Sequence, residues 1–307
     1  VESFLADVRD RTAMIEFAAH VDGVIHLAAV LGTQETIGNP MPAAETNILG
    51  GVNVLDGCRQ YDLPLVYAGV GNYWMRNTYS TTKTTIENLA YQYRDEFSCK
   101  FAVVRPVNAY GPRQRVATPF GPGKVRKIVP AFVCRALSGM PIEIYGDGSQ
   151  ISDMVHVKDV ASVFVDTLDS LFADRVPSTP IEVGPAQSCT VRQVAEEVRV
   201  IASKLLGVDG PDIRFLPMRP GEKASFDVDR EILATYTDSA TSFFNEADAQ
   251  IVSRTLRTLG SVVRADISTL AQIGRNAESF TDLTQGLHET VTWYQENRGS
   301  AWTLPRP

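Results

Sequence analysis

Three short apolar runs divide the first third of the chain, and the stretches between them have the length of a helix. The runs are VDGVIHLAAV (21–30), PLVYAGV (64–70) and KFAVVRPV (100–107). Nearly unbroken apolar runs of this length are typical of parallel strands that are buried on both faces. Residues 42–61 and 79–97 lie between them and predict helices. This alternation predicts right-handed crossovers in a doubly wound α/β sheet.

The pattern changes after NAYGPRQR, where residues 112–124 are rich in Pro and Gly. Shorter elements follow, and together they predict a smaller α/β lobe. We expect helices at 127–138, 158–172 and 190–206, a short strand and turn at 141–150, and strands near 180–183 and 212–216. Residues 227–263 are polar and helix-prone, and the sequence does not place them.

Composition narrows the class of protein. The net charge of −7 argues against a nucleic-acid partner, and no apolar run reaches the roughly 18 residues of a membrane span. The four cysteines lie far apart without a C-x-x-C pair, which suits reduced, buried thiols in a cytoplasmic protein. The four histidines show no metal-ligand spacing, so we expect no metal site.

One turn that such a sheet normally carries is missing from the sequence. A dinucleotide-binding sheet opens with a strand and a G-x-G-x-x-G turn, which holds the pyrophosphate. No such turn occurs in these 307 residues, and the first ten, VESFLADVRD, look like the third strand of such a sheet. We therefore expect the first two strands to lie outside this sequence or not to exist.

The stretch NTYSTTKTTIE (77–87) places Tyr79 four residues before Lys83 on a predicted helix. Residues with this spacing share a helix face, so both side chains can point into one cleft. The spacing alone is weak evidence for an active site, because a tyrosine four residues before a lysine occurs by chance in many proteins. The neighbouring sequence motifs must show whether the pair belongs to a site.

The segments VIHLAA, TNILGGVNVL, YSTTK and RPVNAYGP together resemble the extended short-chain dehydrogenase/reductase family, in particular its NAD-dependent nucleotide-sugar epimerases and dehydratases. The segments GDGSQISDMVHVKDVA, MRPGE and GLHETVTWY match its substrate lobe and C-terminal helix in the same order. The likeness covers most of the chain apart from residues 227–263. It implies a Rossmann-like NAD-binding domain at 1–112 and a mainly substrate-binding lobe at 113–307, with some segments returning to the first domain.

In such enzymes the tyrosine is the acid/base for a sugar hydroxyl. The resemblance therefore gives that role to Tyr79, with Lys83 lowering its pKa by placing a positive charge beside the phenolate. The same ammonium would hydrogen-bond the nicotinamide ribose.

The resemblance also implies a set of cofactor contacts. Small residues at strand ends let a cofactor approach the backbone. Asp7 and Val8 match the position near adenine, although a surface turn is an equal alternative. We interpret His26 as a core histidine and Asn47 as an amide that braces the active-site loop. The full set of expected contacts is Asp7, Val8, Leu27, Ala28, Ala29, Asn47, Tyr67, Ala68, Gly69, Tyr79, Lys83 and Pro106.

Substrate contacts are implied in the same way. Lys127 and Arg219 match positions that face a diphosphate, and Tyr145 would line the nucleotide base. Solvated charge or lobe core is the alternative for these three. Asn108 would touch the sugar or its diphosphate, or serve as a turn former, or do both. Asn72 completes the set.

The sequence departs from the family pattern at the strand before Tyr79. Relatives carry a Ser or Thr there that shares the hydroxyl proton, whereas this chain has Ala68, Gly69 and Val70, followed by a short loop. Candidate substitutes are Thr78, Ser80, Thr81 and Asn72.

Two further departures concern the reaction and the substrate. The dehydratase branch needs an Asp-Glu pair that is absent between Val70 and Tyr79, so we favour epimerisation. Ser152 stands where many relatives place an arginine that meets the diphosphate. Arg113, Arg126 or Lys127 could compensate.

We therefore expect an NAD-dependent nucleotide-sugar epimerase that acts at C4. A 4,6-dehydratase, a 4-ketoreductase and a catalytically silent nucleotide-sugar-binding homologue are the alternatives. The sugar and the nucleotide stay open. We also expect a homodimer through helices 42–61 and 80–97, although their apolar stripe would equally pack on the sheet. The stripe consists of Ile48, Val52, Leu55, Ile86, Leu89 and Ala90.

Overall fold

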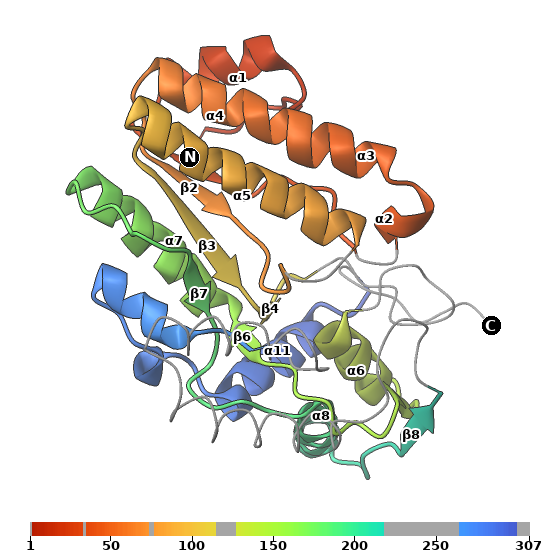
Figure 1. Ribbon diagram of the computed structural model, residues 1–307. Helices are drawn as coiled ribbons and strands as arrows, with labels where there is room; N and C mark the ends of the chain where they lie inside the picture. The colour runs from red at the N-terminus through yellow and green to blue at the C-terminus, as the bar shows by residue number, and fades with distance from the viewer. Residues whose placement is uncertain (1, 33–34, 74–76, 115–126, 218–263, 300–307) are drawn as a thin grey trace, which may run out of the picture. The chain divides into compact units, whose positions relative to one another are not determined.

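The computed structural model describes residues 2–32, 35–73, 77–114, 127–217 and 264–299 (Figure 1). The chain forms two compact units. The first comprises Val1–Val107, Val157–Ala186 and Ala265–Phe280, and the second comprises Asn108–His156, Gln187–Arg264 and Thr281–Pro307. The chain thus changes unit first after Val107, and two later segments return. The functions that we expect for the two domains stay predictions.

A four-stranded parallel sheet forms the centre of the first unit. Its strands, in spatial order, are β1 (Val24–His26), β2 (Leu65–Ala68), β3 (Phe101–Pro106) and β7 (Ile181–Val183). The strands β2 and β3 are almost wholly buried, which is why their sequences read as continuous apolar runs. The predicted doubly wound, Rossmann-like fold class is confirmed.

Helices cover both faces of this sheet. Figure 1 shows α4 and α5 along one face and α7 along the other, where it contacts β1, β2 and β3. The predicted helix 42–61 is one continuous helical stretch that includes a π-helical segment, η1. The helices of this part are α1 (Arg11–Ala18), α2 (Glu35–Gly38), α3 (Met41–Ala43), η1 (Ala44–Leu49), α4 (Gly50–Gln60), α5 (Thr78–Phe97) and α7 (Val157–Phe172).

The strand expected at the start of the chain does not form. Residues 2–10 lie in loop and turn, and Asp10 then caps α1 by accepting a hydrogen bond from the Ala13 amide at 3.1 Å. A strand needs a hydrogen-bonded neighbour. The described residues place none beside this stretch, so the prediction is wrong for the structure.

The second unit is a small α/β lobe. Two elements that the sequence analysis placed in the lobe, the helix 158–172 and the strand near 180–183, belong to the first unit instead. Two pairs of parallel strands form in the second unit, β4 with β6 and β5 with β8. Its elements are β4 (Asn108–Tyr110), α6 (Ile128–Leu137), β5 (Ile142–Tyr145), β6 (Met154–His156), α8 (Val191–Leu206), β8 (Ile213–Leu216) and α11 (Leu283–Glu296). The helices α6, α8 and α11 share one apolar core with β5. Residues 227–263 lie outside the described residues.

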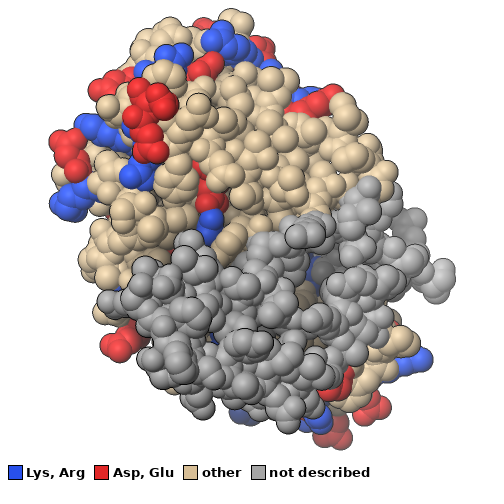
Figure 2. All heavy atoms as spheres, in the orientation of Figure 1, with Lys and Arg blue, Asp and Glu red and all other residues tan. Residues whose placement is uncertain are grey.

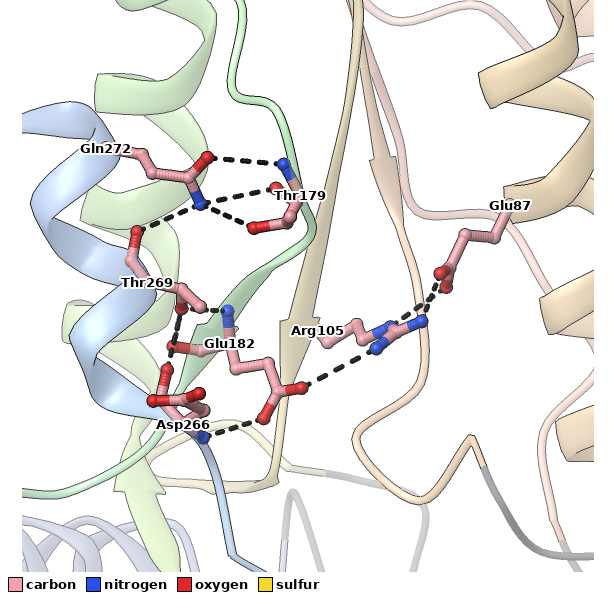
Figure 3. Close-up of polar contacts among 7 residues, drawn as sticks. All are labelled: Glu87, Arg105, Thr179, Glu182, Asp266, Thr269 and Gln272. Carbon is pink, nitrogen blue, oxygen red and sulfur yellow. Dashed lines mark hydrogen bonds and ion pairs between the residues drawn. The ribbon is translucent and has the colours of Figure 1, made fainter. Parts of the chain in front are cut away.

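The segment Ala265–Phe280 returns to the first unit and binds the edge strand β7 through side chains. It contains two short helices, η2 (Ile267–Ile273) and η3 (Ala277–Ser279). The Gln272 amide accepts a hydrogen bond from the Thr179 amide at 3.2 Å and donates one to the Thr179 hydroxyl at 3.0 Å. The Glu182 amide donates to the Thr269 hydroxyl at 2.8 Å (Figure 3). These contacts satisfy backbone groups at the edge of the sheet that would otherwise need another strand.

The apolar stripe on α4 and α5 packs inside the chain. Leu55, Ile86 and Ala90 are at most 1% exposed, and Ile48, Val52 and Leu89 pack against the same core. The stripe therefore packs in the core of the first unit, which is the alternative to a dimer interface. The stripe itself does not indicate a dimer.

The structure bears on the expectations for the cysteines and for the surface of the protein. The four cysteines are free and buried, as predicted. Over the described residues, no helix is both long enough and apolar enough to cross a bilayer. Figure 2 shows charged side chains gathered where α4 and α5 end, while the middle of that face carries few charges.

Gly51 permits the close packing of α4 on α5. A Cβ atom added there would lie 2.6 Å from Cγ1 and 2.8 Å from Cδ1 of Ile86, which is fully buried. Such a contact forces a shift in a close-packed core.

We therefore predict that Gly51→Ala lowers the free energy of unfolding by about 1–3 kcal/mol through overpacking. Urea denaturation measures this. Gly38→Ala is the control, because nothing lies within 4 Å of a Cβ added there. Equal stability of the two variants would contradict the packing role.

Candidate active site

Three parallel strands place their carboxyl ends at one edge of the sheet. The register pairs His26 with Tyr67, and Tyr67 with Val103. Ligand sites of open α/β sheets lie at this edge. The expected cofactor contacts here, all at or just after the ends of β1, β2 and β3, are Leu27, Ala28, Ala29, Ala68, Gly69 and Pro106.

The helix α5 starts at the same edge, directly after the loop that follows β2. Its N-cap is Asn77, whose side-chain oxygen accepts a hydrogen bond from the Ser80 amide at 2.9 Å. This cap fixes the first turn of the helix. Tyr79 therefore lies in the first turn, and Lys83 follows one turn later.

Lys83 carries a buried ammonium that has no hydrogen-bond acceptor among the described residues. The residue is 2% exposed, and Nζ lies 4.2 Å from the centroid of the Tyr67 ring. The Tyr67 hydroxyl in turn donates a hydrogen bond to the Lys83 carbonyl oxygen at 3.2 Å. Burial lowers the pKa of Lys83 to about 7, although the Glu87 carboxylate acts in the opposite direction. Within the described residues, the ammonium keeps its N–H donors free of hydrogen bonds.

The Tyr79 phenol is also without a hydrogen bond to any described residue. Burial raises the pKa of Tyr79 to about 12. That Lys83 lowers this pKa stays a prediction. The loss of solvation dominates, and the charge of Lys83 is itself reduced near neutral pH because its own pKa falls to about 7.

The side-chain amide of Asn47 connects η1 with the loop after β1 and with α5. Asn47 lies in the π-helical segment η1 and is 2% exposed. Its side-chain oxygen accepts a hydrogen bond from the Val30 amide at 2.7 Å. Its Nδ2 donates to the Val30 carbonyl oxygen at 3.1 Å and to the Thr82 hydroxyl at 3.0 Å. The loop after β1 is thereby tied to the residue preceding Lys83.

The structure explains why no hydroxyl residue stands at position 69. A Cβ atom there would lie 2.9 Å from Cγ of Arg105 and 3.0 Å from Cγ1 of Val103. Val70, the next residue, is 5% exposed and apolar. A serine or threonine in place of Gly69 would therefore displace buried neighbours.

The proposed substitutes for that hydroxyl differ in their surroundings. Ser80 is fully buried, and its hydroxyl accepts a hydrogen bond from Nδ2 of Asn77 at 3.1 Å. It belongs to the cap of α5. Thr81 is exposed, and Thr78 and Asn72 are half-buried.

Two expectations near the start of the chain can be compared with the structure. The Asp7 carboxylate accepts hydrogen bonds from the amide and the guanidinium of Arg9, so the surface-turn alternative is present. His26 is 5% exposed and its ring lies 5.7 Å from that of Tyr67, as expected for a core histidine.

Among the described residues, three of the expected substrate contacts, Asn108, Lys127 and Tyr145, lie in the second unit, and Asn72 lies in the first. Asn108 belongs to β4 and donates hydrogen bonds to the Ser152 hydroxyl at 2.9 Å and to the Asp153 carbonyl oxygen at 3.0 Å. It is a strand residue, so the turn-former interpretation is wrong. Lys127 is half-buried at the N-cap position of α6, and Tyr145 is half-buried at the end of β5. Arg113 is exposed, whereas Arg126 and Arg219 lie outside the described residues.

Sequence reasoning missed three charged residues behind the site, namely Glu87, Arg105 and Glu182. All three are buried. One signal pointed to them: Arg105 interrupts the apolar run KFAVVRPV, and a charge in a buried strand requires a partner.

Comparison with known proteins identifies the family. The family model described as the NAD dependent epimerase/dehydratase family matches residues 2–179. The chain belongs to this family. NAD is its cofactor, and the resemblance to the extended short-chain dehydrogenases/reductases is confirmed.

Two curated relatives illustrate the spread of activities. The low-salt glycan biosynthesis protein Agl12 of Haloferax volcanii is 28% identical over 169 residues, which make up 50% of this chain and 52% of the relative. The chain thus spans about half the length of that relative. A dTDP-glucose 4,6-dehydratase of Mycobacterium tuberculosis is 22% identical, over 97% of this chain and 79% of the relative.

Two solved structures share the fold. A UDP-glucose 4-epimerase from Thermotoga maritima, with UDP-glucose, superposes with a TM-score of 0.71 at 20% identity, over 96% of this chain and 84% of that one. A UDP-N-acetylglucosamine 4-epimerase from Methanobrevibacter ruminantium gives a TM-score of 0.72 at 20% identity, over 95% and 82%. Identities this low show the fold alone.

The residues at the sheet edge fit the nicotinamide-ribose end of NAD. Lys83 provides N–H donors that no described residue accepts, and Ala28 and Ala29 leave the strand end open to a ligand. The glycine-rich turn that would hold the pyrophosphate is not in the sequence.

The lowered pKa of Lys83 predicts a specific pH dependence of stability. Between the folded pKa of about 7 and the ordinary value of 10.5, the unfolded chain binds a proton that the folded chain does not. The contribution of Lys83 to stability therefore rises with pH across this window. We expect Lys83→Met to be more stable than the wild type at pH 7, with a gap that narrows by pH 10.

Urea denaturation at several pH values measures this gap. Lys204→Met, at an exposed lysine of α8, is the control and should show a gap independent of pH. A constant gap for Lys83→Met would contradict the lowered pKa.

Proposed function

We propose that the chain is an NAD-dependent nucleotide-sugar epimerase that inverts C4 of an NDP-hexose through a transient 4-keto sugar. One observation carries the proposal. The Tyr79 phenol and the Lys83 ammonium lie on successive turns of α5, and neither has a hydrogen-bond partner among the described residues. Lys83 is buried and Tyr79 is half-buried, and polar groups that lose solvent without gaining a partner cost free energy, so the pair supports a ligand that supplies the partners.

Tyr79 is the proposed acid/base. Its phenolic oxygen takes the proton of the C4 hydroxyl as the sugar is oxidised. It returns the proton after the keto sugar has rotated in the site. Bound NAD would supply the hydride acceptor and donor for C4. Because burial raises the pKa of Tyr79 to about 12, deprotonation needs a positive charge nearby. Protonated Lys83, one turn away, supplies that charge and donates to ribose hydroxyls.

Further contacts belong to the same proposal. The cofactor would lie against the strand ends that carry Leu27, Ala28, Ala29, Ala68 and Pro106, with Asn47 bracing the loop. The sugar nucleotide would be held by Asn72, Asn108, Lys127, Tyr145 and Arg219.

A 4,6-dehydratase is the second candidate, since a dTDP-glucose 4,6-dehydratase aligns with 97% of this chain. The sequence between Val70 and Tyr79 holds no Asp or Glu to remove the C5 proton, which favours the epimerase. Incubation with UDP-, dTDP-, GDP- and CDP-hexoses distinguishes the two. An epimerase yields the C4 epimer, and a dehydratase accumulates a 4-keto-6-deoxy sugar. A ketoreductase consumes NADH when it is given a 4-keto sugar nucleotide instead. A silent homologue yields no product.

Tyr79→Phe tests the assigned base. We expect turnover to fall by at least about 100-fold, because the proton acceptor is removed. Binding of the nucleotide sugar, measured by calorimetry, should stay within a few-fold.

Tyr93→Phe is the matched control on the same helix. The Tyr93 hydroxyl donates to the Asp56 carboxylate at 2.8 Å, outside the proposed site, so turnover should not change. Unchanged turnover in Tyr79→Phe would contradict the proposed role of this phenol.

A homodimer and a cytoplasmic location stay predictions. The weakly charged middle of the α4 and α5 face, together with Leu49 at 51% exposure, supports a dimer through this surface. Sedimentation velocity should give twice the mass of one chain, and Leu49→Asp should shift the protein towards the monomer. A monomeric wild type would refute the dimer.

A further inference from the structure

A buried ion cluster lies directly behind the proposed catalytic helix. It joins Glu87 of α5, Arg105 of β3 and Glu182 of β7, whose side chains are 3%, 7% and 10% exposed (Figure 3). Nε of Arg105 donates to Oε2 of Glu87 at 3.0 Å, and a second guanidinium nitrogen binds Oε1 of the same carboxylate. The third nitrogen lies 3.5 Å from Oε1 of Glu182.

The cluster carries one unit of negative charge. Both carboxylates face the guanidinium, and Glu182 also accepts a hydrogen bond from the Asp266 amide at 2.7 Å. Carboxylates that receive hydrogen bonds in this way are ionised. Two negative charges and one positive charge leave a net charge of −1.

Lys83 balances this charge. It precedes Glu87 by one helical turn, so the two side chains share a face of α5. When Lys83 is protonated, the four buried groups are neutral together. Uncompensated charge in a protein interior is strongly unfavourable, so the cluster favours the ammonium form that burial alone would disfavour.

The other groups that face Lys83 do not supply this charge. Tyr67 of β2 and Tyr79 are neutral at pH 7, because burial raises the pKa of both phenols. His26 of β1 is neutral as well, since burial and then the charge of Lys83 lower its pKa to about 4. Among the described residues, Glu87 is therefore the anion that acts on Lys83.

Neighbouring residues fix the cluster in place. The Tyr73 ring, from the loop between β2 and α5, lies with its centroid 3.8 Å from Cζ of Arg105. Gly69 of the same loop leaves room for the Arg105 side chain. On the other side, the backbone of Glu182 is held by Thr269. Arg105 thus connects the loop, the catalytic helix and the edge strand.

We propose that Glu87, held by Arg105 and Glu182, is a positioning residue that keeps the Lys83 ammonium protonated and in place beside Tyr79 during turnover. This inference rests on the proposed function only for the role of Lys83 in turnover. The charge state of Lys83 can be measured without any substrate.

The test is the titration of Lys83 by NMR. The full chain is prepared with lysine labelled with ¹³C at Cε, and the signal that Lys83→Met removes is assigned to Lys83. The wild type should titrate near pH 7. Glu87→Gln keeps the size of the side chain and removes its charge, so the midpoint should fall by about 1–3 pH units.

Glu182→Gln provides a second, milder variant if Glu87→Gln does not fold. It should lower the midpoint by less, because Glu182 acts through Arg105. Glu143→Gln is the control, since it breaks another Glu–Arg pair, with Arg135 at 3.0 Å, and should leave the midpoint unchanged. A Lys83 midpoint that is unchanged or raised in the variants that fold would overturn the proposal.

Activity gives an independent readout. In Glu87→Gln, the alkaline limb of the kcat–pH profile should move to lower pH by the shift that NMR measures. An equal loss of kcat at every pH would instead show a merely structural role and overturn the inference. If the wild type does not turn over any sugar nucleotide, the proposed function fails, while the NMR titration still decides whether Glu87 controls Lys83.

Discussion

The parallel pairing of β1, β2 and β3 is the interaction on which the rest of the first unit depends. Hydrogen bonds in register bring the three carboxyl ends to one edge, and the loops that leave them start from fixed positions. The helix α5 starts from one such loop, so its first two turns come to the same edge. A one-residue shift of β2 would turn Tyr67 away from Lys83, because side chains alternate between the faces of a strand.

Burial of polar groups at this edge costs free energy of solvation, which contacts with neighbouring aromatic and charged side chains offset. The Lys83 ammonium and the Tyr79 phenol both lose solvent, and burial moves both pKa values away from their ordinary ranges. Lys83 lies on an aromatic ring and one helical turn from Glu87, which is held by Arg105 in a cluster with a net negative charge. Side chains of functional sites are commonly held in position by neighbours that do not react themselves. The same neighbours explain Gly69, because Arg105 fills the space that a side chain there would need.

Membership of the family establishes NAD as the cofactor, but not the substrate or the outcome of the reaction. Epimerases and dehydratases share the fold, and the difference between them lies in a few side chains at the site. In this chain the loop after β2 is short and carries neither the usual hydroxyl nor an acidic pair. The proposed chemistry therefore rests on Tyr79, Lys83 and the charged groups behind them.

The sequence by itself determined the fold class, the order of the strands and helices, and the Tyr79–Lys83 pair, because apolar periodicity and helical spacing are local properties. It did not determine that 2–10 form no strand, that Asn108 belongs to a strand, or that the pKa of Tyr79 is raised. Those outcomes depend on pairing and burial, which join residues far apart in the chain. The contact of Arg105 with Glu87 and Glu182 is the clearest case: each charge is visible in the sequence, but only the tertiary structure brings the three together.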